Sequence, residues 1–300
     1  MVVLQRLILL LILTSINLSA GEIYKYKDEN GKWIFTDKKP VSNKSEKIEY
    51  KNDKKKRVKP RVYVKNADGE NQLVVKNPFY APIEMEIYAG IFRKGRLHKV
   101  LPATSTTVVY SSKQAIPRYR YRWLMGDPAA EETGYKYLFP VLSKSKHQIS
   151  QSFNGRFSHY QEPNKYAVDI AMPVGTYIRA AREGIVVQVK EDYHMSGTSG
   201  YFLDKANYVK VLHKDGTYAI YAHILLGTSL VKPGDKVAAG DKLARSGSSG
   251  FSTGPHLHFV IRKNAGRKLV SVPFVFVDNN GKSFTPRRGQ KIKGLYTRRE

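Results

Sequence analysis

The segment Ser252–Phe259 constrains the fold more than any other stretch of the chain. Gly254-Pro255 marks a turn, and the next four residues, His256 to Phe259, alternate between polar and apolar side chains. Successive side chains of a strand point to opposite faces, so the two histidines would share one face while Leu257 and Phe259 enter a core. An isolated His-x-His pair is more often a half-buried strand with two surface histidines. Other ligand-type residues in the same half of the chain favour a shared site.

The N-terminus and the absence of cysteine indicate where the protein acts. Residues 1–20 contain one positive charge, Arg6, then an apolar run over residues 7–13 and small residues at Ser19-Ala20. This arrangement is typical of a secretory signal, since its apolar run is short for a membrane span, and an uncleaved anchor is the less favoured alternative. With no cysteine, the chain has neither a disulfide framework nor a lipoprotein acylation site. We expect an exported protein of the periplasm or cell envelope, or one secreted from the cell, without a membrane span once the signal is removed.

The charge of the chain predicts the kind of partner. Its 300 residues carry a formal net charge of +26 at pH 7, which implies attraction to polyanions. Nucleic acid would explain the charge but not the histidines, and a signal segment argues against it. We therefore expect anionic envelope polymers or lipopolysaccharide as partners and no specific nucleic acid. The sequence does not indicate an oligomeric state.

The first half of the chain is predicted to consist of accessory modules. Aromatic and β-branched runs at residues 23–26 and 33–36 flank Asn30-Gly31, which is a strong hairpin signal. Short strand-like runs separated by turn residues follow over residues 61–141 and predict a β-sandwich. The predicted domains are a signal peptide (1–20), a β-hairpin module (21–37), a basic linker (38–60), the β-sandwich (61–141), a catalytic domain (142–278) and a poorly ordered basic tail (279–300).

Three strand-like runs of the predicted catalytic domain each carry a ligand-type side chain. Asp169 lies on the face of its strand opposite Val168 and Ile170, and the pair His256 and His258 lies opposite Leu257 and Phe259. In the third run we expect His223 on one face and the buried residues on the other, namely Tyr218, Ile220, Ala222 and Ile224. We expect His213, beside an Asp-Gly turn, at the surface. Hydrolytic zinc needs three protein ligands of the His and Asp/Glu type, and no His-Glu-x-x-His helix is present to supply them.

Four motifs in this order resemble the lysostaphin/LytM-type zinc metalloendopeptidases, which cut peptide bonds in bacterial peptidoglycan. They are YAVDIAMPVGT over residues 166–176, and the segments 218–223, 231–237 and 252–259. The match covers about the last half of the chain. The resemblance implies an all-β catalytic domain with an antiparallel sheet lining a groove and one zinc ion. It also implies that Asp169 and His258 are zinc ligands and that His223 and His256 lie beside the metal-bound water.

One position departs from the family pattern. The first ligand is normally a histidine four residues before the aspartate, where this chain has Lys165. A protonated lysine has no lone pair to give to a metal. The nearest upstream histidine is His159, and the turn-like insertion over residues 161–165 would let the chain double back. We therefore predict His159 as the first ligand; His147 and His194 are weaker candidates because no strand pattern directs them to the site.

These observations predict a secreted zinc metalloendopeptidase that hydrolyses cross-links or stem peptides of peptidoglycan. His223 and His256 would divide the tasks of accepting the water proton and of stabilising the oxyanion or protonating the leaving amine. The alternative is a non-catalytic LytM-type domain that binds the wall and regulates other hydrolases. The substitution at Lys165 keeps that alternative open.

Overall fold

The computed structural model describes residues 22–27, 33–36, 46–49 and 58–294. These residues form β-strands, turns and one short 3-10 helix, η1 (Gly200–Phe202), with no α-helix among them. The all-β prediction is therefore confirmed. Within the described ranges, no helix has the length and apolar character needed to cross a membrane. The chain divides into two compact units, residues 1–54 and 55–300, and the predicted signal peptide lies outside the described residues.

The first unit contains a three-stranded antiparallel sheet in the order β2-β1-β3. Its strands are β1 (Glu22–Lys27), β2 (Trp33–Thr36) and β3 (Glu46–Glu49). The pairing of β1 with β2 is the predicted hairpin, although its turn at Asn30-Gly31 lies outside the described residues. The basic-linker prediction is wrong over β3, because this segment pairs with the second edge of β1. Strand pairing uses main-chain groups, so a charged composition does not exclude it.

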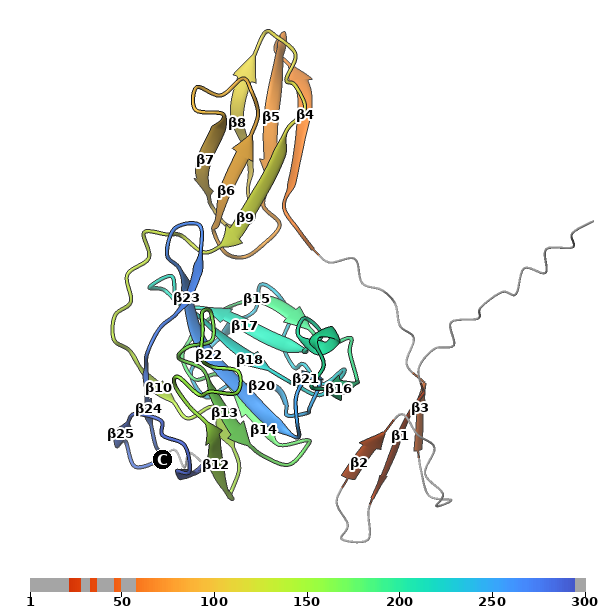
Figure 1. Ribbon diagram of the computed structural model, residues 1–300, viewed down its shortest axis with the longest axis vertical. Helices are drawn as coiled ribbons and strands as arrows, with labels where there is room; N and C mark the ends of the chain where they lie inside the picture. The colour runs from red at the N-terminus through yellow and green to blue at the C-terminus, as the bar shows by residue number, and fades with distance from the viewer. Residues whose placement is uncertain (1–21, 28–32, 37–45, 50–57, 295–300) are drawn as a thin grey trace, which may run out of the picture. The chain divides into compact units, whose positions relative to one another are not determined.

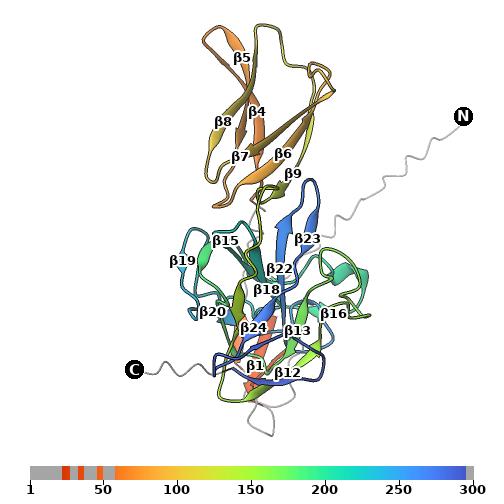
Figure 2. The same ribbon diagram turned by 90° about the vertical axis from the view of Figure 1, so that its left-hand side faces the viewer.

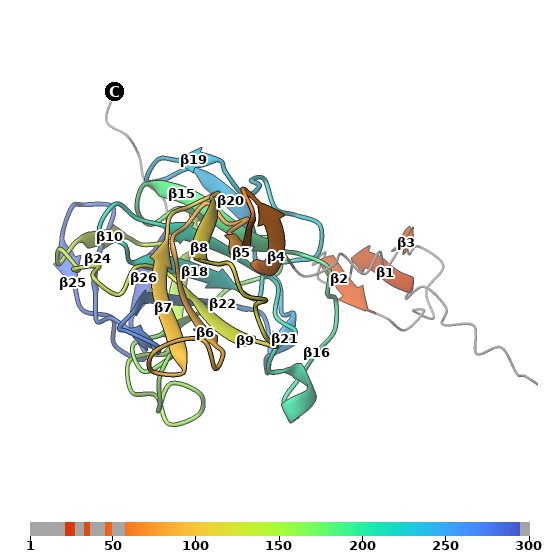
Figure 3. The same ribbon diagram turned by 90° about the horizontal axis from the view of Figure 1, so that it is seen from above.

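The second unit begins with two three-stranded antiparallel sheets that form the predicted sandwich. One has the order β4-β5-β8 and the other β7-β6-β9, and Figure 3 shows them as two separate rows of strands. The strands are β4 (Arg61–Ala67), β5 (Glu70–Lys76), β6 (Ile83–Tyr88), β7 (Arg96–Leu101), β8 (Thr106–Ser112) and β9 (Arg120–Met125). Leu73 and Val75 of one sheet and Ile83 and Met85 of the other belong to one buried cluster. This shared core holds the two sheets face to face.

The rest of the second unit is built around one large sheet with the strand order β19-β15-β17-β18-β22-β13-β12-β26, and β23 also pairs with β22. Figures 1 and 2 show β22 running through this domain beside β18 and β13. The strands of the large sheet are β12 (Lys146–Gln151), β13 (Val168–Ala171), β15 (Gly184–Lys190), β17 (Tyr208–Leu212), β18 (Tyr218–Ala222), β19 (Lys236–Val237), β22 (His256–Asn264), β23 (Leu269–Ser271) and β26 (Lys291–Lys293).

Three small sheets complete this domain, and two of them contain a parallel pair. One joins β10 (Lys136–Leu138), β24 (Val275–Val277) and β25 (Ser283–Phe284). The second joins β11 (Val141–Leu142), β14 (Tyr177–Arg179) and β20 (Lys242–Arg245). The third pairs β16 (Ser196–Gly197) with β21 (Gly250–Phe251).

The main core explains why the polar residues of β13 and β22 share the opposite face. Val168 and Ile170 of β13 and Leu257 and Phe259 of β22 are each 0% exposed and lie in the main core cluster. The ring of Phe259 is central to this core, since it packs against the rings of Tyr221, Phe274 and Phe276. Because side chains alternate along a strand, Asp169, His256 and His258 then project from the other face.

Strand β18 differs from its predicted pattern, because both of its faces are buried. Ala219 and Tyr221 belong to the main core, whereas the expected buried set, with the exception of Ile224, belongs to a smaller cluster on the other face. The expected set is buried, as predicted, but the prediction of a single buried face is wrong. In a strand that is covered on both sides, the apolar pattern does not tell one face from the other.

Both boundaries of the predicted catalytic domain differ from the structure. At the N-terminal end, β10 pairs with β24, so strands of this domain begin before residue 142. At the C-terminal end, the predicted poorly ordered tail is wrong over residues 279–294, because β26 pairs with β12 and Gly289 N–H donates to Ile149 O over 2.8 Å. The edge of β12 holds this basic segment through main-chain hydrogen bonds.

Candidate metal centre

Three adjacent strands form the base of the site. In the antiparallel register Asp169 of β13 lies opposite His258 of β22, and Ala222 of β18 lies opposite the same histidine on its other side. Ala171 of β13 lies opposite His256. Directly opposed residues have Cβ atoms about 5 Å apart. The register therefore brings one carboxylate and two imidazoles together on one face.

His223 reaches the same face because the backbone changes direction at the end of β18. Strict alternation would place His223 with Tyr221 in the main core. Its φ of 64° is instead in the left-handed region, which ends the alternation. Its Nδ1 lies 2.6 Å from Ser249 O, and its ring centroid lies 4.4 Å from that of His256.

His159 comes from the loop between β12 and β13. This loop is fastened to the sheet beyond the histidine: Ser271 donates from N and Oγ to the Glu162 carboxylate over 2.6 and 2.7 Å. Arg262 Nε also donates to Pro163 O over 2.8 Å. The side chain of His159 is 0% exposed.

Lys165 takes no part in the site. Its side chain is exposed, and its ammonium lies 5.4 Å from the centroid of the Tyr166 ring. Its carbonyl accepts a hydrogen bond from Asn154 N over 2.7 Å, which joins the two ends of the loop. The chain thus doubles back between His159 and Lys165, as the insertion predicted.

His159, Asp169 and His258 bring three donor atoms to one point. The distances are 3.3 Å from His159 Nε2 to His258 Nδ1, 3.3 Å from His159 Nε2 to Asp169 Oδ1, and 2.9 Å from His258 Nδ1 to Asp169 Oδ1. Ligands on a tetrahedral zinc ion, each about 2.0–2.1 Å from the metal, lie about 3.3 Å from one another. The donor set and its spacing therefore fit a metal ion.

Hydrogen bonds with Gln151 of β12 and with Ser152, the residue after it, orient two of these metal-binding side chains. Ser152 O lies 3.2 Å from His159 Nδ1, so this nitrogen carries the proton and Nε2 keeps its lone pair for a metal. Gln151 Nε2 donates to Asp169 Oδ2 over 3.0 Å and to Ser158 Oγ over 2.7 Å. No sequence pattern marks Gln151 as a site residue, because only the pairing of β12 with β13 brings it opposite Asp169.

Burial and hydrogen bonding set the charges of the site. Burial alone would raise the pKa of Asp169, but its side-chain interactions with His159 and His258 hold that pKa well below its usual value. Burial, followed by the neighbouring His256 and His258, lowers the pKa of His223 to about 3. Burial also lowers the pKa of His258, against the opposing effect of Asp169. An ionised Asp169 and a neutral His258 are the forms in which these two side chains bind a metal.

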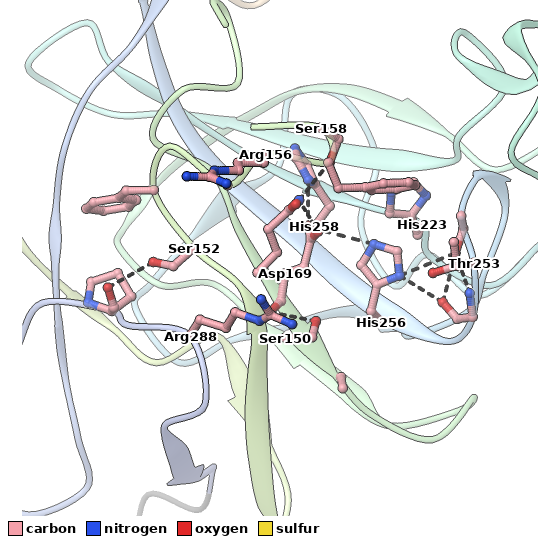
Figure 4. A pocket seen from close by; sticks show the side chains of 18 of the residues that line it. Ser150, Ser152, Arg156, Ser158, Asp169, His223, Thr253, His256, His258 and Arg288 are labelled. Carbon is pink, nitrogen blue, oxygen red and sulfur yellow. Dashed lines mark hydrogen bonds and ion pairs between the residues drawn. The ribbon is translucent and has the colours of Figure 1, made fainter. Parts of the chain in front are cut away.

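The site opens into a pocket of about 1040 Å³ (Figure 4). Asp169, His223, His256 and His258 line it, together with residues 150–158, 251–255 and 286–288 and Ala171. His256 is partly accessible, and its Nε2 lies 3.7 Å from Asp169 Oδ1.

The other histidines do not join this group. His213 is 2% exposed, with Nδ1 2.8 Å from Glu183 O, and burial lowers its pKa to about 4. The prediction of a surface histidine at 213 is therefore wrong, because the chain around the turn covers the ring. His147 is also buried, and its Nδ1 lies 3.4 Å from Ala171 O. Neither of them, nor His194, lines the pocket.

Comparison with known proteins finds relatives of the domain that contains this site. Residues 163–270 match the family described as Peptidase family M23. The chain is 33% identical over 124 residues to peptidoglycan DD-endopeptidase ShyA of Vibrio cholerae, a match that covers 40% of this chain and 26% of that protein. It is 38% identical over 119 residues to glycyl-glycine endopeptidase ALE-1 of Staphylococcus capitis, covering 39% of this chain and 30% of that protein.

The shared region is a minor part of this chain and of both curated relatives. The chain spans between a quarter and a third of the length of these curated relatives. Among solved structures, the catalytic domain of lysostaphin from Staphylococcus simulans is 31% identical. The match covers 39% of this chain and 79% of that chain, with a TM-score of 0.28.

Proposed function

Because residues 163–270 form a domain of peptidase family M23, we propose that the protein is a zinc-dependent endopeptidase acting on peptide bonds of bacterial peptidoglycan. The observation that carries this proposal is the convergence of His159, Asp169 and His258 within 4.8 Å of one another. The names of the matched relatives support peptidoglycan as the substrate class.

His159 Nε2, Asp169 Oδ1 and His258 Nδ1 would hold the metal. A zinc ion bound there would lower the pKa of a water molecule and polarise the scissile carbonyl. Gln151 and Ser152 keep two of the three donors in orientation through the hydrogen bonds described above. The presence of His159 argues for the peptidase rather than for the non-catalytic alternative that Lys165 left open.

His256 is the residue we assign to proton transfer. Its Nδ1 lies 2.8 Å from Gly254 O, so this nitrogen carries the proton and Nε2 offers a lone pair towards the pocket. Nε2 can accept the proton of the attacking water and deliver it to the leaving amine. His223 is held in the same tautomer by Ser249 O, and its ring beside His256 gives it a supporting role in the same step.

The charge and the relatives' names support a location in the cell envelope. An exported protein with a net charge of +26 would be attracted to anionic wall polymers, and that attraction would weaken as salt is raised. We propose these polymers and peptidoglycan as partners, and no specific nucleic acid.

Metal analysis combined with digestion of purified sacculi tests the proposed function. We expect about one zinc per chain and release of peptide fragments from sacculi by the full chain, since the donor set holds one ion. His159→Ala should lose both properties, whereas the matched control His194→Ala should keep both. A folded wild-type chain that binds no metal and releases no fragments would overturn the proposal in favour of a wall-binding regulator.

A further inference from the structure

Three arginines line the pocket of the metal centre, and the peptidase chemistry does not use them. Arg156 comes from the loop that carries His159, and Arg287 and Arg288 come from the segment between β25 and β26. In Figure 4, Arg156 and Arg288 lie on the opposite side of Asp169 from His256 and His223. Arg156 and Arg288 therefore lie at an end of the pocket distinct from the proton-transfer end, and Arg287 is the chain neighbour of Arg288.

The chain holds Arg287 and Arg288 in place through their neighbours. Pro286 is buried, and its carbonyl accepts a hydrogen bond from Ser152 Oγ over 2.9 Å. Beyond the arginines, Gly289 N donates to Ile149 O and Ile149 N donates to Gln290 O, each over 2.8 Å. Anchoring on both sides fixes where the backbone of these two residues runs along the pocket.

The charge of the three guanidinium groups is not neutralised within the part of the chain that the structure describes. Among residues 58–294 no ion pair joins any of them to a carboxylate, whereas Arg182 is paired with Asp215 over 2.6 Å. Asp169 is the only carboxylate among the described residues that line the pocket, and it is already bonded to the histidines. The positive charge at this end is therefore available to a ligand.

We propose that Arg156, Arg287 and Arg288 form a subsite for a free carboxylate of the substrate. This inference rests on the proposed function and specifies its substrate class: stem peptides that carry free carboxylates, in preference to bridges built of glycine alone. A guanidinium binds a carboxylate through two parallel hydrogen bonds. An uncharged glycine bridge offers nothing equivalent to this end of the pocket.

Binding of a matched pair of peptides tests the subsite directly. The two stem peptides are identical except that one carries a free carboxylate where the other carries a carboxamide. Dissociation constants are measured by calorimetry on the zinc-loaded full chain carrying His256→Ala, so that turnover is slow. We expect the acid to bind about tenfold more tightly than the amide. A hydrogen bond between charged groups in a solvent-accessible pocket changes affinity by about this factor.

Charge-matched variants in the same background locate the effect. The double variant Arg287→Gln/Arg288→Gln should bring the ratio of the two dissociation constants close to one. The control Lys291→Gln/Lys293→Gln removes the same charge from exposed positions of β26, outside the pocket lining. It should keep the tenfold ratio. A ratio near one in the parent, or an unchanged ratio in Arg287→Gln/Arg288→Gln, overturns the subsite.

Cleavage of the same peptides by the chain with intact His256 separates this inference from the proposed function. Cleavage of both peptides with equal KM would leave the peptidase standing and overturn the subsite. The expected binding ratios without any cleavage would leave the subsite standing and overturn the peptidase. A KM that is about tenfold lower for the acid, with similar kcat, supports both.

Discussion

Replacing Gln151 by leucine should weaken metal binding without removing a metal ligand. Gln151 Nε2 donates to the outer oxygen of Asp169, Oδ2, while Oδ1 faces the two histidines. Leucine fills a similar volume and donates no hydrogen bond. The change therefore tests whether this single hydrogen bond holds the carboxylate in its ligand orientation.

The size of the effect follows from the environment of the bond. The Asp169 side chain is 12% exposed, so water replaces the lost donor poorly. A hydrogen bond to a charged group contributes about 1.5–3 kcal/mol, and each 1.4 kcal/mol corresponds to about a tenfold change in affinity. We expect zinc to bind about 10–100-fold more weakly, which agrees with the usual effect of partners that orient metal ligands.

Competition with a chromophoric zinc chelator measures the change. Gln148→Leu is the matched control, because Gln148 lies on the same strand, β12, with an exposed side chain far from Asp169 in the register. The control should bind zinc as the wild type does. Equal zinc affinity in Gln151→Leu and wild type would refute the claim that Gln151 orients the ligand.

Three further predictions concern the surroundings of the site. In Gly155→Ala the new Cβ would lie 2.8 Å from Gln151 Cδ, so we expect weaker zinc binding of the same order as in Gln151→Leu, measured in the same competition assay. Burial lowers the pKa of His213 to about 4 in the folded state. As the pH falls from about 6.5 to 4, the His213 imidazole is therefore protonated in the unfolded state before it is protonated in the folded state. The free energy of unfolding should then drop by up to about 3 kcal/mol over that interval in urea titrations, and a drop that is equally steep in His213→Gln would contradict this assignment. Tyr221→Phe leaves the buried Ala181 N–H without the acceptor that lies 2.7 Å away, and should lower the free energy of unfolding by about 1–3 kcal/mol; an unchanged urea midpoint would contradict it.

Local sequence patterns predicted the strands well where one face is covered. The alternation around Leu257 and Phe259 indicated which residues enter the core, and both are 0% exposed. The same reasoning failed for β18, where both faces are apolar and buried. It also failed for β3 and β26, because charged segments can pair through main-chain groups that composition does not report.

The residue types of the site were visible in the sequence, but their partners were not. Asp169, His223, His256 and His258 could be named from strand alternation and the family resemblance, and His159 as the nearest histidine upstream of Asp169. A glutamine on a strand, such as Gln151, carries no signal until the neighbouring strand is known. Arg287 and Arg288 were placed in the predicted tail because the pairing of β26 with β12, which brings them to the pocket, leaves no sign in the sequence.

The sequence alone predicted an all-β chain. It also identified the strand with His256 and His258, the aspartate at 169 on a second strand, and the lysine at 165 in place of an expected ligand. The insertion predicted that His159 turns inward, but the contacts that hold the loop there, from Glu162 and Arg262, could not be predicted. The physical reason is that alternation along a strand is a local property of the backbone. Convergence on one metal ion depends instead on strand register and on hydrogen bonds between residues about a hundred positions apart.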